Sequence, residues 1–231
     1  MTRRLPRIVL CGLAALALAA CGAFEQAPQD DAGPGAAVRG IDAEGQEARD
    51  LYLQVVLGLQ NESRWNASLA YLDDYDLRYP GDPSSQVLRA DALAATGDTA
   101  AAEALYRGLL ETRFSPAAHA GLGQLRALAG DWNGAVAGYA NAVALRPSNA
   151  RFLNNLGYAQ LRAGRHQEAL STLSRAFEID QNRDGIRNNY AIALHLTGHR
   201  AEYEQLIRSI QDQTERDAVA ELVENWSGSQ S

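Results

Sequence analysis

The chain has 231 residues, of which 46% are apolar and only 7% aromatic, and its formal net charge is −7. This length suits one sizeable domain with a processing segment, and a composition rich in Ala and Leu favours packed helices over sheets. An acidic chain without Lys or a basic cluster in its domain is a poor candidate for binding nucleic acid.

Residues 1–20 have the features of a secretory signal. A positive start with Arg3, Arg4 and Arg7 precedes an apolar run too short to favour a membrane-spanning helix. The run ends in the sequence LAAC, whose last residue is Cys21, and this resembles the lipobox of bacterial lipoproteins. The resemblance implies cleavage before Cys21 and a diacylglycerol on its sulfur. The alternatives are an ordinary signal with an incidental Cys and twin-arginine export, which the residues after the Arg pair do not support.

Lipidation of Cys21 predicts where the mature chain is held. Several acyl chains, each burying on the order of 0.8 kcal/mol per CH₂, anchor a protein stably in a bilayer. In lipoproteins an Asp after the Cys favours the inner membrane, so Gly22 implies the periplasmic face of the outer membrane. Because Cys11 lies in the predicted signal and Cys21 carries the lipid, no thiol or disulfide is expected.

Four segments are predicted along the chain. The lipidated Cys and a Gly-, Ala- and Pro-rich tether without apolar periodicity follow the signal, and the repeats and a capping segment come next. Their bounds are 1–20 for the signal, 21–48 for the tether, 49–217 for the repeats, and 218–231 for a capping helix and tail.

The repeats are predicted from a period of about 34 residues, which is typical of helix–turn–helix arrays. A shift by this period superimposes Leu122, Leu156 and Tyr190, and it also superimposes the glycines at 130, 164 and 198. A helix–turn–helix pattern with such a period indicates an α-solenoid, so an all-α fold is expected. Five units are expected, the second one residue short, at about 49–82, 83–115, 116–149, 150–183 and 184–217.

Within each unit, large and small residues alternate so that two helices can approach. In the fourth unit, Leu156-Gly157 in the first helix faces Ala169 in the second, and bulky Leu173 follows four residues later. Gly164, where the first helix ends, favours a left-handed conformation. This pattern resembles the tetratricopeptide repeat (TPR) family, in which Trp-x-x-Leu-Gly-x-x-Tyr is followed by Ala, Phe, Ala and Pro. Tyr203 replaces the small Ala in the fifth unit, which predicts looser or rotated packing there.

After the fifth unit, a final helix is predicted from apolar residues on one face. A solenoid needs a cap over the exposed side of its last unit, and this helix suits that role. The alternative is a helix that binds a partner. The residues on the face are Ala218, Val219, Leu222, Val223 and Trp226.

No catalytic or metal-binding arrangement is predicted. His195 and His199 are four residues apart, but Gly198 ends the helix between them and no Glu follows His195 as a zinc protease requires. No Gly-rich phosphate loop follows a strand, and no Ser/His/Asp set can be proposed from spacing. The chain is therefore not expected to be an enzyme or to hold a cofactor.

The TPR resemblance implies that the first helices line a concave groove that holds a segment of a partner protein. Asn154 and Asn188 lie one period apart and could bond a partner's backbone, while Tyr158 and Arg162 are anchors of the type enriched in hot spots. The alternative is that such amides, Asn155 and Asn189 above all, bond only inside the stack. The predicted partner-binding residues are Arg151, Asn154, Tyr158, Arg162, Asn188, Ile192 and His195.

The last two repeats point to a biological setting. The sequences LNNLGYAQLRAGRHQEAL and IRNNYAIALHLTGHRAEYEQLI resemble the TadD family, the TPR lipoproteins of the tight-adherence (Tad/Flp) pilus. The resemblance implies an outer-membrane-anchored periplasmic scaffold that acts as a pilotin or assembly factor for a secretin or another pilus component. The alternatives are a type IVa pilus pilotin and a general cell-envelope adaptor.

Overall fold

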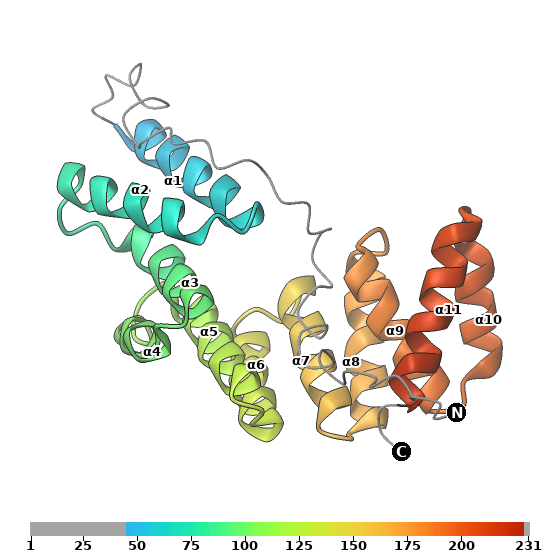
Figure 1. Cartoon of the computed structure of the whole chain (residues 1–231). Helices are drawn as coiled ribbons and strands as arrows, with labels where there is room; N and C mark the ends of the chain where they lie inside the picture. The colour runs from blue at the N-terminus through green and yellow to red at the C-terminus, as the bar shows by residue number, and fades with distance from the viewer. Residues whose placement is uncertain (1–44, 229–231) are drawn as a thin grey trace, which may run out of the picture.

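The computed structural model describes residues 45–228, which form eleven α-helices, one short 3₁₀ turn and no strand (Figure 1). The predicted signal, Cys21 and most of the predicted tether lie outside the described residues. The helices are α1 (Gln46–Asn61), α2 (Trp65–Arg78), α3 (Gln86–Thr96), α4 (Thr99–Gly108), α5 (Ser115–Leu128), α6 (Trp132–Leu145), α7 (Ala150–Arg162), α8 (His166–Ile179), α9 (Asp184–Leu196), α10 (Arg200–Ser209) and α11 (Gln213–Gly228), and the turn η1 (Pro83–Ser85) precedes α3.

The helices pair in chain order into five helix–turn–helix units, from α1–α2 to α9–α10, and α11 follows the fifth (Figure 1). The second helices of the first four units contact the first helix of their own unit and the first helix of the next. This contact pattern is that of stacked repeats, in which each unit buries the apolar side of its neighbour. The predicted all-α solenoid of five units with a C-terminal helix is confirmed.

Glycines end the first helices of four units in the predicted left-handed conformation. The φ angles are 94° at Gly97, 77° at Gly130, 74° at Gly164 and 77° at Gly198. After α7, the Gly164 amide donates to the Leu161 carbonyl at 3.1 Å and the next amide donates to the Gln160 carbonyl at 2.8 Å. These bonds satisfy carbonyls that the end of a helix leaves unpaired, so the chain can turn within a few residues into α8.

Small residues bring the two helices of a unit close together. A Cβ on Gly157 of α7 would lie 2.4 Å from Cγ of Leu173 in α8, so the leucine fills the space that the glycine leaves. In the third unit the approach is between backbones, because a Cβ on Gly138 of α6 would lie 2.6 Å from the Cα of Gly123 in α5. Small residues therefore set the spacing between helices as predicted, although the nearest neighbour of Gly157 is Leu173 and not Ala169, which the sequence places opposite it.

The fifth unit departs from its neighbours as its sequence predicts. Tyr203 of α10 is half-buried, and its ring lies edge-on to His195 of α9 at 5.9 Å between ring centres. α10 packs less closely on α9 than α8 packs on α7. The bulky side chain at a position where the other units have a small residue accounts for this looser pairing.

α11 covers the apolar side of α9. Val219 and Val223 are 3% and 2% exposed and belong to one core cluster with Leu206 and Ile210. Leu222 is 37% exposed, so the buried stripe of α11 is narrower than the sequence predicts. The helix nevertheless closes the last unit as a cap.

Candidate partner-binding site

The first helices of the units form one inner face. First helices of neighbouring units contact each other directly at three steps, α1 with α3, α3 with α5 and α7 with α9, and α9 contacts α11 in the same way. Elements meet more closely on the inner side of a curved stack than on its outer side, where the second helices lie. Positions that recur at the repeat period on first helices therefore line up along this inner face.

Two tryptophans, a tyrosine and an arginine come together where α6, α7 and α11 meet and are called the Trp–Arg cluster here: Trp132 at the start of α6, Tyr158 and Arg162 in α7, and Trp226 in α11. The Arg162 guanidinium lies 4.3 Å from the centre of the Trp132 ring and 5.8 Å from that of Trp226. The Tyr158 ring lies edge-on to both, at 5.9 Å from Trp132 and 5.7 Å from Trp226. Arg162 also donates a hydrogen bond of 3.2 Å from Nη1 to the Tyr158 hydroxyl.

The geometry of the cluster matches known attractive arrangements. A cation over an aromatic face contributes about 0.5–1 kcal/mol when exposed and about 2 kcal/mol when desolvated, and edge-on ring pairs contribute about 0.5–1.5 kcal/mol. Tyr158 and Arg162, which the sequence predicts as partner anchors, are thus brought together. They also hold α6, α7 and α11 to one another, so they have a structural role that the sequence does not predict.

Ile192 does not lie on the exposed part of this face. Its side chain is 2% exposed and belongs to the core cluster against which Trp226 packs. Ile192 lies one repeat period after Tyr158 and one period before Trp226, so the two aromatic residues flank it along the inner face. The prediction that Ile192 contacts a partner directly is corrected, because its side chain is buried in this core.

Asn154, one of the two asparagines predicted to bind a partner, is hydrogen-bonded to another asparagine of the stack. Asn189 of α9 donates a 2.9 Å hydrogen bond from Nδ2 to Oδ1 of Asn154 in α7. This bond joins two side chains across the fourth and fifth units. Asn189 therefore bonds inside the stack, although its partner is a side chain and not the backbone. Oδ1 of Asn188 is buried and accepts no hydrogen bond from any described residue, so it has free acceptor capacity.

Arg151 and His195 are exposed, as a role in binding requires. Arg151 lies 5.8 Å from the centre of the Phe152 ring, and its charge acts on Asp91 of α3. Burial raises the pKa of the Asp91 carboxyl, although a 2.5 Å hydrogen bond from the Tyr106 hydroxyl and the charge of Arg151 act to lower it. The first helices of the second and fourth units are therefore linked electrostatically.

Trp132 and Trp226 are the residues of the site that sequence reasoning misses. A signal for Trp226 is present, since one more repeat period after Ile192 reaches it, but the sequence places this residue on the capping face. No such signal exists for Trp132, because it lies at the start of a second helix and contacts the first helix of the next unit. Its role follows only from the three-dimensional arrangement.

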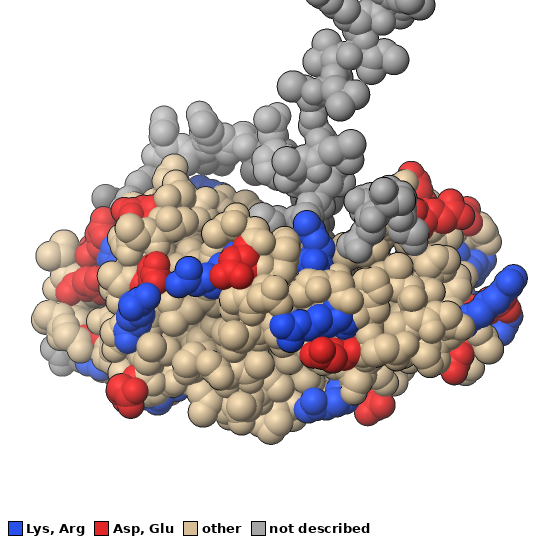
Figure 2. Space-filling model, turned by 90° about the horizontal axis from the view of Figure 1, so that it is seen from below, with Lys and Arg blue, Asp and Glu red and all other residues tan. Residues whose placement is uncertain are grey.

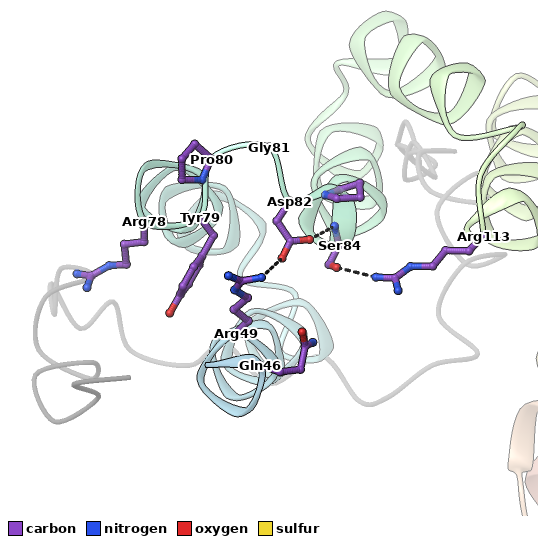
Figure 3. A pocket seen from close by; sticks show the side chains of 10 residues that line it. Gln46, Arg49, Arg78, Tyr79, Pro80, Gly81, Asp82, Ser84 and Arg113 are labelled. Atoms are coloured by element: carbon purple, nitrogen blue, oxygen red, sulfur yellow. Dashed lines mark hydrogen bonds and ion pairs between the residues drawn. The ribbon is translucent and has the colours of Figure 1, made fainter. Parts of the chain in front are cut away.

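A separate depression of about 410 Å³ lies at the other end of the chain, between the ends of α1 and α2 and the turn η1 (Figure 3). Arg49 forms a 3.7 Å ion pair with Asp82, which also accepts a 2.9 Å bond from the Ser84 amide. Arg113 donates to the Ser84 hydroxyl at 3.1 Å. These contacts tie α1 to η1, while Nε of Arg49 is buried without a hydrogen-bond partner among the described residues.

No group of three or more His, Cys, Asp or Glu side chains in residues 45–228 could hold a metal ion. Nδ1 of His199 lies 2.8 Å from the Thr197 hydroxyl. Within this part of the chain no helix is both long and apolar enough to cross a membrane.

Charge is distributed in small mixed groups on the face shown in Figure 2. Arg side chains lie beside Asp and Glu, and wide areas between them carry no charge. Binding to a polyanion typically uses a continuous basic patch or stripe. This face therefore suits contacts with a protein better than contacts with nucleic acid.

Known proteins share both the repeat and the fold. The TPR repeat family model matches residues 123–164, and the tetratricopeptide repeat model matches residues 150–183. The TPR repeat-containing protein PA4299 of Pseudomonas aeruginosa is 36% identical over 167 residues, which cover 72% of this chain and 66% of that protein. The chain thus aligns with a little less than two thirds of that relative's length.

Solved structures give the same fold at low identity. TTC0263, a thermophilic TPR protein of Thermus thermophilus, has a TM-score of 0.62 at 18% identity over 76% of this chain and 98% of its own. PilF of Pseudomonas aeruginosa has a TM-score of 0.59 at 15% identity over 78% of this chain and 89% of its own. The described residues have an all-α TPR fold, and the chain contains TPR repeats.

Proposed function

We propose that this chain is a lipid-anchored periplasmic TPR scaffold that binds a segment of another protein on its inner face and assists pilus assembly. The Trp–Arg cluster carries the binding part of the proposal. Aromatic and Arg side chains gathered on one face are the residue types that supply most of the energy in protein interfaces. TPR repeats are interaction modules and are typically non-catalytic, so binding is the activity that the fold supports.

The cellular setting is supported by the sequence. The lipobox resemblance at Cys21 supports an anchor at the periplasmic face of the outer membrane. The resemblance of the last two repeats to the TadD family supports a role in Tad/Flp pilus biogenesis, with a secretin or another assembly component as the partner. The similarity to PilF concerns the fold alone, and a type IVa pilotin or a general envelope adaptor is the alternative.

Replacing Cys21 by Ser in the native host tests this proposal. Without a thiol the chain cannot receive the lipid, so secretin multimers in the outer membrane should fall at least several-fold, as they should when the gene is deleted. The measurement is an immunoblot of outer-membrane fractions for multimeric secretin. Cys11→Ser is the matched control, because this residue lies in the predicted signal and ahead of the cleavage site. Normal multimers in both the deletion and the Cys21→Ser strain would contradict the proposal, and capture of envelope enzymes without a secretin would favour the adaptor.

A further inference from the structure

Two tyrosines of neighbouring second helices occupy equivalent places in the repeat. Tyr106 of α4 and Tyr139 of α6 are 33 residues apart, and their side chains are buried, at 0% and 6% exposed. The Tyr106 hydroxyl donates a 2.5 Å hydrogen bond to the carboxyl of Asp91 in α3, the first helix of its own unit. The second unit therefore shows that a carboxyl fits against a hydroxyl at this place.

The third unit has no carboxyl at the equivalent place. The residue 33 positions after Asp91 is Gln124 of α5, and it is exposed. No described residue accepts a hydrogen bond from the Tyr139 hydroxyl. Its oxygen is also not among the described side-chain atoms that are buried without a partner. The small exposed part of Tyr139 therefore includes the hydroxyl, which can still donate a hydrogen bond.

Arg151 of α7 lies within electrostatic reach of both hydroxyls. Its guanidinium is exposed and forms no ion pair or hydrogen bond with any described residue. Burial raises the pKa of Tyr106 and of Tyr139, so both hydroxyls keep their proton at neutral pH. The charge of Arg151 acts on the pKa of both hydroxyls in the opposite direction. An unpaired guanidinium thus stands near a hydroxyl that has no acceptor.

We propose that Tyr139 and Arg151 form a subsite for an Asp or Glu side chain of the partner, in the role that Asp91 has one unit earlier. A hydroxyl and a guanidinium both donate to a carboxylate, and hydrogen bonds to an ionised acceptor are roughly twice as strong as neutral ones. The partner is accordingly a protein segment that carries an acidic residue. The inference rests on the proposed function, namely that a protein segment binds on the inner face.

The charges of the two first helices beside this subsite favour an acidic segment over a basic one. Neither α5 nor α7 contains an Asp or Glu, whereas α7 contains Arg151 and Arg162. Asp91 of α3 already accepts the bond from Tyr106. A basic side chain bound between α5 and α7 would find no counter-ion on either helix, while an acidic one finds Arg151.

A carboxylate built into the chain tests the subsite without any partner. Gln124→Asp places it where Asp91 stands relative to Tyr106, and Gln124→Asn is the matched neutral variant. At pH 7 the melting temperature of the Asp variant should exceed that of the Asn variant by roughly 3 °C, because a hydrogen bond to a charged group is gained. Thermal unfolding followed by circular dichroism is the measurement, and it also establishes that both variants fold.

Three further changes make this test specific. The difference between the Asp and Asn variants should disappear when Tyr139→Phe or Arg151→Gln is added to both. Arg146→Gln should leave the difference unchanged. Arg146 is an exposed arginine at the end of α6, and its charge acts on the pKa of neither hydroxyl.

A phage-displayed library of random peptides tests the chemistry of the partner. The library is selected in parallel on the wild-type chain and on the Gln124→Asp chain, whose own carboxylate should block the subsite. Peptides that prefer wild type should contain an Asp or Glu. In fluorescence anisotropy with peptides made as C-terminal amides, replacing this residue by Asn or Gln should weaken binding at least fivefold. The same replacement should not change binding to the Arg151→Gln chain.

Equal melting temperatures of the Asp and Asn variants would overturn the inference, as would a difference that survives Tyr139→Phe and Arg151→Gln. A library that yields no peptide preferring wild type, or only peptides without an acidic residue, would also overturn it. Failure of the proposed function is a separate outcome. Normal secretin assembly in the Cys21→Ser strain would remove the pilus role without changing the melting temperatures, and equal melting temperatures would leave the secretin test intact.

Discussion

Replacing Tyr158 and Arg162 together by Ala is expected to lower the free energy of unfolding by about 3 kcal/mol. The double change removes the cation–π contact with Trp132 at 4.3 Å and two edge-on ring contacts, which link α6, α7 and α11. For a domain of this size the melting temperature should fall by roughly 6–12 °C. Thermal unfolding followed by circular dichroism is the measurement.

The matched control lies one period earlier on the same face. Gln124 and Leu128 of α5 occupy the positions of Tyr158 and Arg162, but both are exposed, with Leu128 at 43%. Replacing both by Ala should change stability by less than about 0.5 kcal/mol. Equal melting temperatures for the two double variants would show that the Trp–Arg cluster does not hold the late units together. The sequence alone places Tyr158 and Arg162 on a binding surface. From that placement, the melting temperature of the Tyr158→Ala, Arg162→Ala variant would be nearly that of wild type.

Tyr106→Phe is expected to lower the free energy of unfolding by about 2–3 kcal/mol at neutral pH. Tyr106 is fully buried, and its hydroxyl donates a 2.5 Å hydrogen bond to the Asp91 carboxylate. Removing the hydroxyl leaves the buried Asp91 carboxyl without its donor, which costs more than the loss of an exposed bond. Chemical denaturation at a series of pH values is the measurement.

The sign of the pH dependence follows from Asp91. Burial raises the pKa of its carboxyl in the folded chain. The contribution of this carboxyl to the free energy of unfolding is therefore fully present below the unfolded pKa of about 3.9, and it is lost as pH rises through the folded pKa. Tyr106 favours the charged form through its hydrogen bond. The cost of Tyr106→Phe should therefore be larger above the folded pKa of this carboxyl, where it is charged, than at pH 3, where it is protonated in both states.

Asp91→Asn provides the control for this prediction. The amide oxygen can still accept the hydrogen bond from Tyr106 but carries no charge. Tyr106→Phe in the Asp91→Asn background should cost less than in the wild-type background, and the cost should not depend on pH between 3 and 7. A cost that is independent of pH in the wild-type background would contradict the assignment.

The repeat architecture could be predicted from the sequence because it depends on local and recurring features. Gly164 and its equivalents had to adopt positive φ to end the first helices, and they do. A small residue at Gly157 had to let α7 and α8 approach, and it does, although its nearest neighbour is Leu173 and not the predicted Ala169. Each of these features involves neighbouring helices of one unit, which the repeat period describes fully.

The composition of the candidate site could be predicted only in part. Tyr158 and Arg162 were found from their place on a first helix, but their partners come from elsewhere. Trp132 belongs to a second helix of the preceding unit, and Trp226 to a helix two units later. Contacts that skip a unit depend on the reach of individual side chains, and no periodicity contains that information. The burial of Ile192 likewise depends on the packing of several helices in one core cluster.

The most direct test of the central claim, that a protein partner binds on the inner face, is site-specific photo-crosslinking in the native host. A photoreactive benzoylphenylalanine replaces His195, an exposed residue of the first helix α9. A second strain carries it at Ile179, which is 49% exposed at the end of the second helix α8. We expect a crosslinked product containing one defined protein from position 195 and none from position 179. Crosslinking from position 179 with none from position 195 would contradict it.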